Sequence, residues 1–266
     1  GHLTMPNRRN RPKLNDASTV FAILAALLAL LGGTIILTGY LLDIPALRGI
    51  LRGWAPMKPN TALCFILNGL ALLLSQIPSV RFDRNKAART GWSGFLALLL
   101  MLPILVCLLT LGEYLFAGNL PIDALLINER LAAPSNPGAF RMAPESAISH
   151  ILLAVALWLN MHPSLARRRV MVSAFLSVMV VALAVSAMST YFSPVLGMFG
   201  WFGLSVMAGD AAILFMLLGT ASFLIVCRQK TFSWELGKTT TTGLALGTVL
   251  LVIIGITAIR SQYEVS

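Results

Sequence analysis

Three stretches of this chain repeat one short pattern. They are Met57-Lys-Pro-Asn-Thr-Ala-Leu-Cys-Phe-Ile-Leu67, Met142-Ala-Pro-Glu-Ser-Ala-Ile-Ser-His-Ile-Leu152 and Met207-Ala-Gly-Asp-Ala-Ala-Ile-Leu-Phe-Met-Leu217. Each stretch opens an apolar segment, and each follows another apolar segment with a tyrosine near its outgoing end. The tyrosines are Tyr40, Tyr114 and Tyr191. The pattern predicts one helical hairpin copied three times.

The composition is that of a membrane protein. Apolar residues make up 57% of the chain, charged residues 11%, and the mean hydropathy is +0.82. A helix of roughly 20 apolar residues crosses the hydrocarbon core of a bilayer. Seven stretches qualify, at about 18–42, 60–79, 92–117, 144–161, 169–192, 206–227 and 242–260. None alternates with the period of two that a membrane barrel strand would need.

We therefore predict an all-α, polytopic membrane bundle with seven transmembrane helices. Residues 1–17 form a basic N-terminal segment, in which Gly1–Thr4 ahead of Met5 are typical of a tag remnant. Residues 18–238 form a six-helix unit. Its hairpins are expected at about 18–79, 92–161 and 169–227. Residues 239–266 are expected to hold an exit helix and the start of a periplasmic segment.

The basic residues predict the orientation, because Lys and Arg collect in short cytoplasmic loops. One side of the predicted bundle holds 14 of the 20 Lys and Arg residues, in the N-terminal segment and in the loops around 81–89, 167–169 and 228–238. This arrangement predicts an N-terminus inside and a C-terminus outside. Anionic lipid head groups account for the net charge of +10, so nucleic acid is not a predicted partner.

The repeated motif has a structural explanation. Pro59 and Pro144 fall near the first turn of their helices, where a missing amide hydrogen costs little. The residues that follow, among them Asn60, Glu145 and Asp210, are suited to helix N-caps and first turns.

A functional explanation builds on the same geometry. Three polar helix starts around a pseudo-threefold axis would bring tyrosines and ionisable groups together near the outer leaflet. Ionisable groups inside a span are costly and by default mark a site. The candidate ligand-binding residues are Glu113, Tyr114, His150, Tyr40, Tyr191 and Asp210.

Glu113 and His150 are the clearest departures from the repeat. Glu113 lies in an apolar run, whereas Gly39 and Thr190 occupy its equivalent positions. His150 replaces the phenylalanine found at Phe65 and Phe215. It could hydrogen-bond Glu113, titrate near neutral pH, or ligate a metal or haem, and an interhelical hydrogen bond is the structural alternative.

No cofactor is predicted. Haem with two histidine ligands would need a second histidine, and His162 falls at the opposite membrane face. A metal site from Glu113, His150 and Asp210 has suitable ligand types but no supporting sequence spacing. The three cysteines, Cys64, Cys107 and Cys227, stand singly inside predicted spans and indicate packing residues.

The first repeat resembles a recurring segment of a known family. Met57-Lys-Pro-Asn-Thr-Ala-Leu-Cys-Phe-Ile-Leu-Asn-Gly-Leu-Ala-Leu-Leu-Leu74 is similar to part of the N-terminal multi-pass membrane region of bacterial histidine kinases and diguanylate cyclases. Leu111-Gly-Glu-Tyr-Leu-Phe-Ala-Gly-Asn-Leu-Pro-Ile-Asp123, followed by Arg141-Met-Ala-Pro-Glu-Ser-Ala147, resembles its second hairpin. Gly255-Ile-Thr-Ala-Ile-Arg260-Ser-Gln-Tyr263 is similar to the span that leads into a CHASE-type periplasmic module. The chain departs from the family pattern at Glu145, His150 and Gly209.

The resemblance implies a sensory input domain in the bacterial inner membrane, with the catalytic output outside this chain and a homodimer by family analogy. A hydrophobic or amphiphilic ligand, or a redox cofactor, would bind near the outer leaflet and act through the last helix. A small-solute or lipid transporter is the alternative. A third hypothesis is a lipid enzyme with Glu113 and His150 as acid and base. No P-loop, HExxH or GxSxG motif occurs, so no catalytic residue is assigned.

Overall fold

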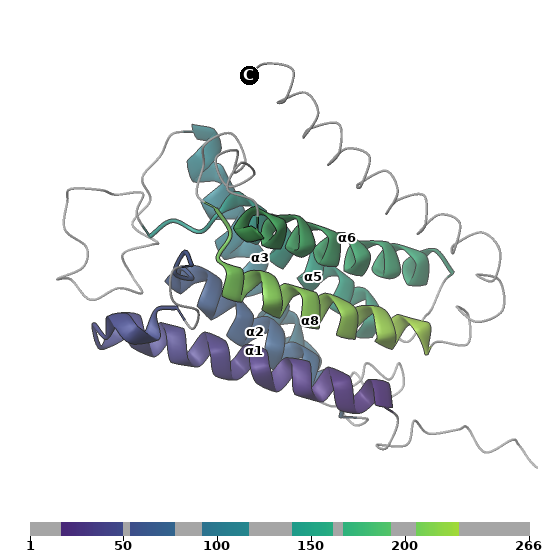
Figure 1. Cartoon of the computed structure of the whole chain (residues 1–266). Coiled ribbons are helices and arrows are strands. Elements are labelled where there is room, and N and C mark those ends of the chain that lie inside the picture. The colour runs from purple at the N-terminus through teal and green to yellow at the C-terminus, as the bar shows by residue number, and fades with distance from the viewer. Residues whose placement is uncertain are drawn as a thin grey trace, which may run out of the picture.

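The computed structural model describes six parts of the chain: residues 17–49, 54–77, 92–116, 140–161, 167–192 and 206–228. Every regular element within these ranges is helical. The elements are α1 (Ala17–Leu41), a short 3-10 turn η1 (Pro45–Leu47), α2 (Pro59–Ser75), α3 (Trp92–Phe116), α5 (Pro144–Met161), α6 (Arg167–Phe192) and α8 (Gly209–Cys227). The all-helical prediction is confirmed for these ranges (Figure 1).

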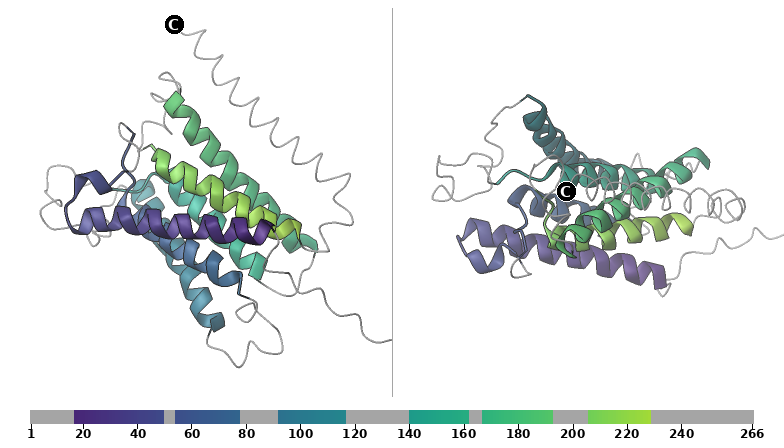
Figure 2. Two further views of the ribbon diagram at one scale, coloured as in Figure 1. Left: turned by 60° about the horizontal axis from the view of Figure 1, so that its bottom comes forward. Right: turned by 45° about the horizontal axis from the view of Figure 1, so that its top comes forward.

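The helices form two concentric sets of three. The inner helices α2, α5 and α8, which begin with the repeated motif, all contact one another. Each outer helix packs against its hairpin partner and one further inner helix: α1 against α2 and α8, α3 against α5 and α2, and α6 against α8 and α5. Figures 1 and 2 show α8 flanked by α1 on one side and α6 on the other. The triplicated hairpin therefore closes into a bundle with pseudo-threefold symmetry.

Within the described ranges, four helices are long and apolar enough to cross a membrane, which indicates a multi-pass membrane protein. They are Ala17–Leu41, Gly94–Phe116, Arg168–Tyr191 and Gly209–Cys227. The exposed large apolar side chains lie almost entirely on the outer helices, such as Leu31 on α1, Leu105 on α3 and Phe175 on α6. In water so large an apolar surface would be a liability, whereas in a bilayer it is the surface that meets lipid.

The predicted spans at 60–79 and 144–161 are helical but different in character. Helix α2 is a shorter apolar helix of 17 residues, and α5 is not among the four candidate spans. Both belong to the inner set, where they contact protein and can carry buried polar residues. The predicted exit helix at 242–260 lies outside the described residues.

Glycines let the hairpin helices approach closely. A Cβ atom added at Gly33 on α1 would lie 2.6 Å from the Ala62 carbonyl oxygen on α2. Gly69 on α2 faces the Ala26 carbonyl oxygen, and its equivalent in the third repeat, Gly219, faces Val181 on α6. Membrane helices commonly associate through such small residues, because packing rather than the hydrophobic effect holds them together.

The first turns of the inner helices confirm one prediction and correct another. Helix α2 starts at Pro59 and α5 at Pro144, as expected. The N-cap interpretation is wrong for α2 and α8, whose N-caps are Lys58 and Ala208, neither with a side-chain cap bond. The expectation of acids in the first turn is confirmed for Glu145 and Asp210. A proline or glycine takes the first helical position, so the polar residue after it falls inside the first turn.

Candidate functional site

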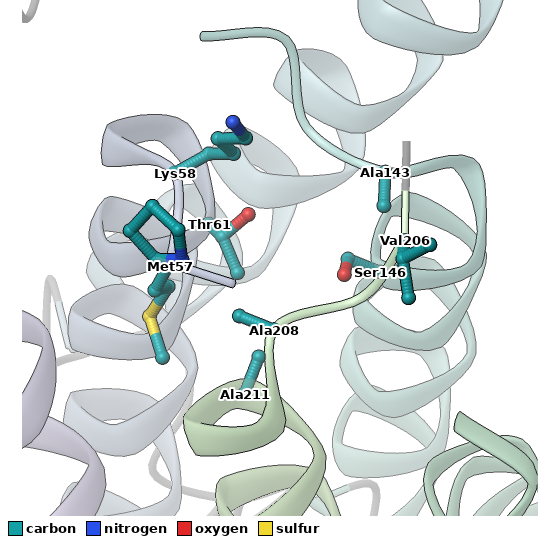
Figure 3. Close-up of a pocket in the computed structure, with 9 residues that line it drawn as sticks. Met57, Lys58, Thr61, Ala143, Ser146, Val206, Ala208 and Ala211 are labelled. Atoms are coloured by element: carbon teal, nitrogen blue, oxygen red, sulfur yellow. The ribbon is translucent and has the colours of Figure 1, made fainter. Parts of the chain in front are cut away.

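The three helix starts converge on one small pocket at the end of the bundle axis (Figure 3). It encloses about 190 Å³ of empty space, part of it open to solvent. The lining residues are Pro56, Met57, Lys58, Thr61, Ala143, Ser146, Val206, Ala208 and Ala211. Equivalent repeat positions recur among them, so the pocket is a direct product of the triplication. The part of this space that a water molecule can occupy is only about 10 Å³, which is room for about one water.

Three aromatic rings close the axis within the inner helices. Phe65, His150 and Phe215 occupy the same position in the three repeats, and all three are fully buried. Their ring centroids are 4.6 Å apart for Phe65 and His150, 4.6 Å for Phe65 and Phe215, and 4.5 Å for His150 and Phe215. These distances are typical of packed aromatic pairs.

The histidine in this ring cluster makes an interhelical hydrogen bond. Nδ1 of His150 lies 3.1 Å from Nδ2 of Asn68, which joins α5 to α2 in the buried interior. The main chain of Thr61 is a second polar neighbour of the imidazole. This contact corresponds to the structural alternative for His150, an interhelical hydrogen bond.

Glu113 on α3 pairs with an arginine just before α5. Its Oε2 lies 3.3 Å from Nε of Arg141, and both side chains are largely buried. The Arg141 guanidinium also lies over the Tyr114 ring, 5.2 Å from its centroid, and the Tyr114 hydroxyl donates to the Met142 carbonyl oxygen at 3.1 Å. Glu113 and Tyr114 thus attach the C-terminal end of α3 to the start of the second motif.

Tyr191 repeats this attachment in the third hairpin. Its hydroxyl donates to the Met207 carbonyl oxygen at 2.8 Å. The Trp54 indole stacks on the Tyr191 ring with 4.5 Å between centroids. The same indole lies against Gly209, where an added Cβ would be 1.7 Å from its Cε3 atom. Trp54 therefore explains why the third repeat carries glycine where the other two carry proline.

Tyr40 is buried at the C-terminal end of α1. Its ring meets Phe140 edge-on, with the centroids 6.0 Å apart, and the Arg48 guanidinium lies 5.3 Å from the Tyr40 centroid. Arg48 also forms an ion pair with Asp43. Tyr40 thus contacts Arg48, in the segment that follows α1, and Phe140, which lies shortly before α5.

The three repeats also place a polar residue in each inner first turn: Asn60, Glu145 and Asp210 are all buried. Both carboxylates interact electrostatically with Tyr191 on α6. An acidic group near a helix N-terminus is stabilised by the positive end of the helix dipole.

None of the six predicted site residues lines the axial pocket. His150 lies in the ring cluster, Glu113 and Tyr114 attach α3, and Tyr191 attaches α6. Asp210 lies in the first turn of α8, and Tyr40 lies at the C-terminal end of α1. Within the described part of the chain, no three His, Cys, Asp or Glu side chains converge as metal ligands would, so Glu113, His150 and Asp210 form no such group there. The role of the six residues in ligand binding stays a prediction.

The sequence reasoning missed a buried polar network toward the other end of the bundle. The Asn160 amide on α5 donates to Ser222 on α8, and Ser173 on α6 donates to Asn160 at 2.7 Å. Ser177 bonds Ser222 at 2.8 Å. The spacing of four residues between Ser173 and Ser177 predicts that both lie on one face of α6, but it does not predict which residues they bond. The network binds α5, α6 and α8 into one unit.

No protein-family profile, curated protein or solved structure matches this chain. The functional assignment therefore depends on the geometry and on the residues themselves.

Proposed function

We propose that this chain is a membrane-embedded sensory input domain of a bacterial signalling protein, in the inner membrane with its N-terminus inside. The observation that supports this proposal is a small pocket at the helix-start end of the axis, next to the ring cluster of Phe65, His150 and Phe215 one helical turn further along the inner helices. A shallow, closed pocket suits a group that binds and leaves on the same side. By family analogy the parent protein is a histidine kinase or diguanylate cyclase that works as a homodimer.

Two tyrosines couple the pocket to the outer helices. Tyr114 and Tyr191 each bond the carbonyl of the motif methionine, and the next residue, Ala143 or Ala208, lines the pocket. A ligand that shifts a helix start therefore also shifts α3 or α6. A ligand can bias two packing states only by its differential affinity for them. The exit helix at 242–260 would carry that bias to the output.

A transporter would need a path for its solute through the same inner helices. A solute that crosses along the axis must separate three rings that are in mutual contact and fully buried. Transporter sites lie near the bilayer midplane, often where helices are interrupted. The inner helices α2, α5 and α8 are each continuous over their described length. These features favour sensing over transport.

The test begins with the reading frame beyond Ser266. A further membrane span followed by a kinase or cyclase domain supports the proposal, and Glu113→Gln in that full protein should then alter signal-dependent output without unfolding the domain. An unaltered response in that variant would count against the site assignment. A stop codon close to Ser266, together with solute counterflow in liposomes, would favour transport instead.

A further inference from the structure

Three sulfur-containing side chains from different parts of the chain meet inside the bundle and form a sulfur cluster. They are Cys64 on α2, Cys107 on α3 and Met142 just before α5, and all three are fully buried. The Cys64 and Cys107 thiols hydrogen-bond each other, and Sγ of Cys107 lies 4.0 Å from Sδ of Met142. The side chains packed with them are apolar: Ala147, Val106, Leu111 and Ile151.

The two cysteines are departures from the repeat that coincide at one helix contact. Cys64 takes the position that Ser149 holds in the second repeat, and Cys107 takes the position that Ala184 holds in the third. The contact between α2 and α3 corresponds by the pseudo-threefold axis to the contact between α5 and α6, and neither of those helices contains a cysteine. Packing alone therefore does not require sulfur on both sides of the α2–α3 contact.

The type and spacing of the sulfur atoms suit a soft metal ion. In a trigonal set with metal–sulfur bonds of about 2.3 Å, the sulfur atoms lie roughly 4 Å apart. The separation of 4.0 Å between Cys107 and Met142 matches this value. Thiolate and thioether sulfur are soft ligands that select Cu(I). Zinc is a poorer fit to three sulfurs, because structural zinc sites are almost always tetrahedral with four ligands.

The apolar surroundings favour an ion with a single charge. Unpaired charge in an apolar interior is costly, so the bound ion and its ligands should sum to zero. When Cu(I) binds, one thiol releases its proton to solvent, and the resulting thiolate balances the single positive charge. The other thiol and the methionine thioether then bind as neutral ligands, and no further counter-ion is needed.

The main chain of Met142 is fixed by its neighbours. The Tyr114 hydroxyl donates to the Met142 carbonyl oxygen at 3.1 Å. The next residue, Ala143, lines the axial pocket together with Thr61, which lies one helical turn before Cys64. The sulfur cluster therefore lies within about one turn of the helix starts, and the partner of the Met142 carbonyl helps to orient a ligand in the way that outer-shell contacts do in metal sites.

We propose that Cys64, Cys107 and Met142 form a binding site for Cu(I), with three sulfur ligands that join α2, α3 and the start of α5. The site is separate from the axial pocket. The proposal goes beyond the sensing role and does not depend on it, because metal binding is measured on the purified chain without any signalling output.

The experiment is anaerobic titration of the full chain in nanodiscs with Cu(I), in competition with the coloured chelator bathocuproine disulfonate. We expect one Cu(I) per chain, and X-ray absorption of the complex should show three sulfur neighbours at about 2.3 Å. The spectrum needs no substitution, so it decides the ligand set even if a variant fails to fold. Failure to take Cu(I) from the chelator, or nitrogen and oxygen neighbours in place of sulfur, would overturn the proposal.

The repeats and the third cysteine supply matched variants. Cys64→Ser and Cys107→Ala introduce the residues of the sister repeats, and each should weaken Cu(I) binding by at least about 100-fold, since loss of even an outer-shell partner costs roughly 10–100-fold. Cys227→Ser is the control, because Cys227 lies at the C-terminal end of α8 and outside the sulfur cluster. Its affinity should equal that of the unmodified chain. Equal affinity in all three variants would refute the assignment.

Discussion

Replacing His150 with phenylalanine tests whether the three equivalent ring positions form one packed unit. His150→Phe introduces the residue that both other repeats carry, so the aromatic cluster with Phe65 and Phe215 is retained. The substitution removes the partner of Asn68, whose Nδ2 lies 3.1 Å from the imidazole Nδ1. The side chain of Asn68 is fully buried, so water cannot replace the lost bond.

The size of the effect follows from two competing magnitudes. An interhelical hydrogen bond in a membrane protein contributes about 0.6 kcal/mol on average. A buried polar group left without a partner costs about 1–3 kcal/mol. Because Asn68 stays buried in the variant, the second effect dominates. We expect His150→Phe to lower the free energy of unfolding by about 1–3 kcal/mol.

The other repeats supply the matched control. Leu153 and Leu218 occupy the position of Asn68, so the double variant His150→Phe/Asn68→Leu gives the first two repeats the residue pair of the third. Replacing both partners with apolar groups is nearly neutral, and we expect most of the lost stability to return. Unfolding in mixed micelles of increasing SDS content, followed by circular dichroism, measures all three proteins. A double variant as unstable as the single one would refute the reasoning.

Two further substitutions test contacts near the starts of the inner helices by the same unfolding measurement. Gly209→Ala should lower the free energy of unfolding by about 1–3 kcal/mol, because its Cβ would overlap the Trp54 indole. In a Trp54→Ala background the same substitution should have almost no effect. Equal losses of stability in both backgrounds would contradict the packing explanation. Arg141→Met should lower the free energy of unfolding by about 3–5 kcal/mol, since it leaves the buried Glu113 carboxylate without its arginine partner. Glu113→Gln/Arg141→Met should recover much of that loss, and a stable single variant would show that the pair matters little.

The helices and their repeat could be predicted because their causes are local. Run length and hydropathy predict membrane helices, and the prolines at Pro59 and Pro144 mark helix starts through their missing amide hydrogens. Repetition then predicts similar packing for the three hairpins, which is why a pseudo-threefold axis could be expected. An asparagine inside an apolar helix, such as Asn68, predicts an interhelical bond because no other partner exists there.

The contents of the site could not be predicted in the same way. The sequence predicts Glu113 as a ligand-binding residue because it lies in an apolar run. Its partner Arg141 lies close to it only because α3 packs against the start of α5. The pocket is lined by Thr61 and Ser146, which look like ordinary first-turn residues in the sequence. These residues come together only because the three helix starts face one axis.

By itself the sequence determined the helical membrane class, the triplicated hairpin and the unusual positions of Glu113, His150 and Gly209. Hydropathy, proline placement and repetition act within a segment, so they can be read along the chain. Only the tertiary structure decided that Phe65, His150 and Phe215 meet, and that Trp54 occupies the space left by Gly209. These contacts join side chains from different hairpins, and their distances depend on how the hairpins close around the axis.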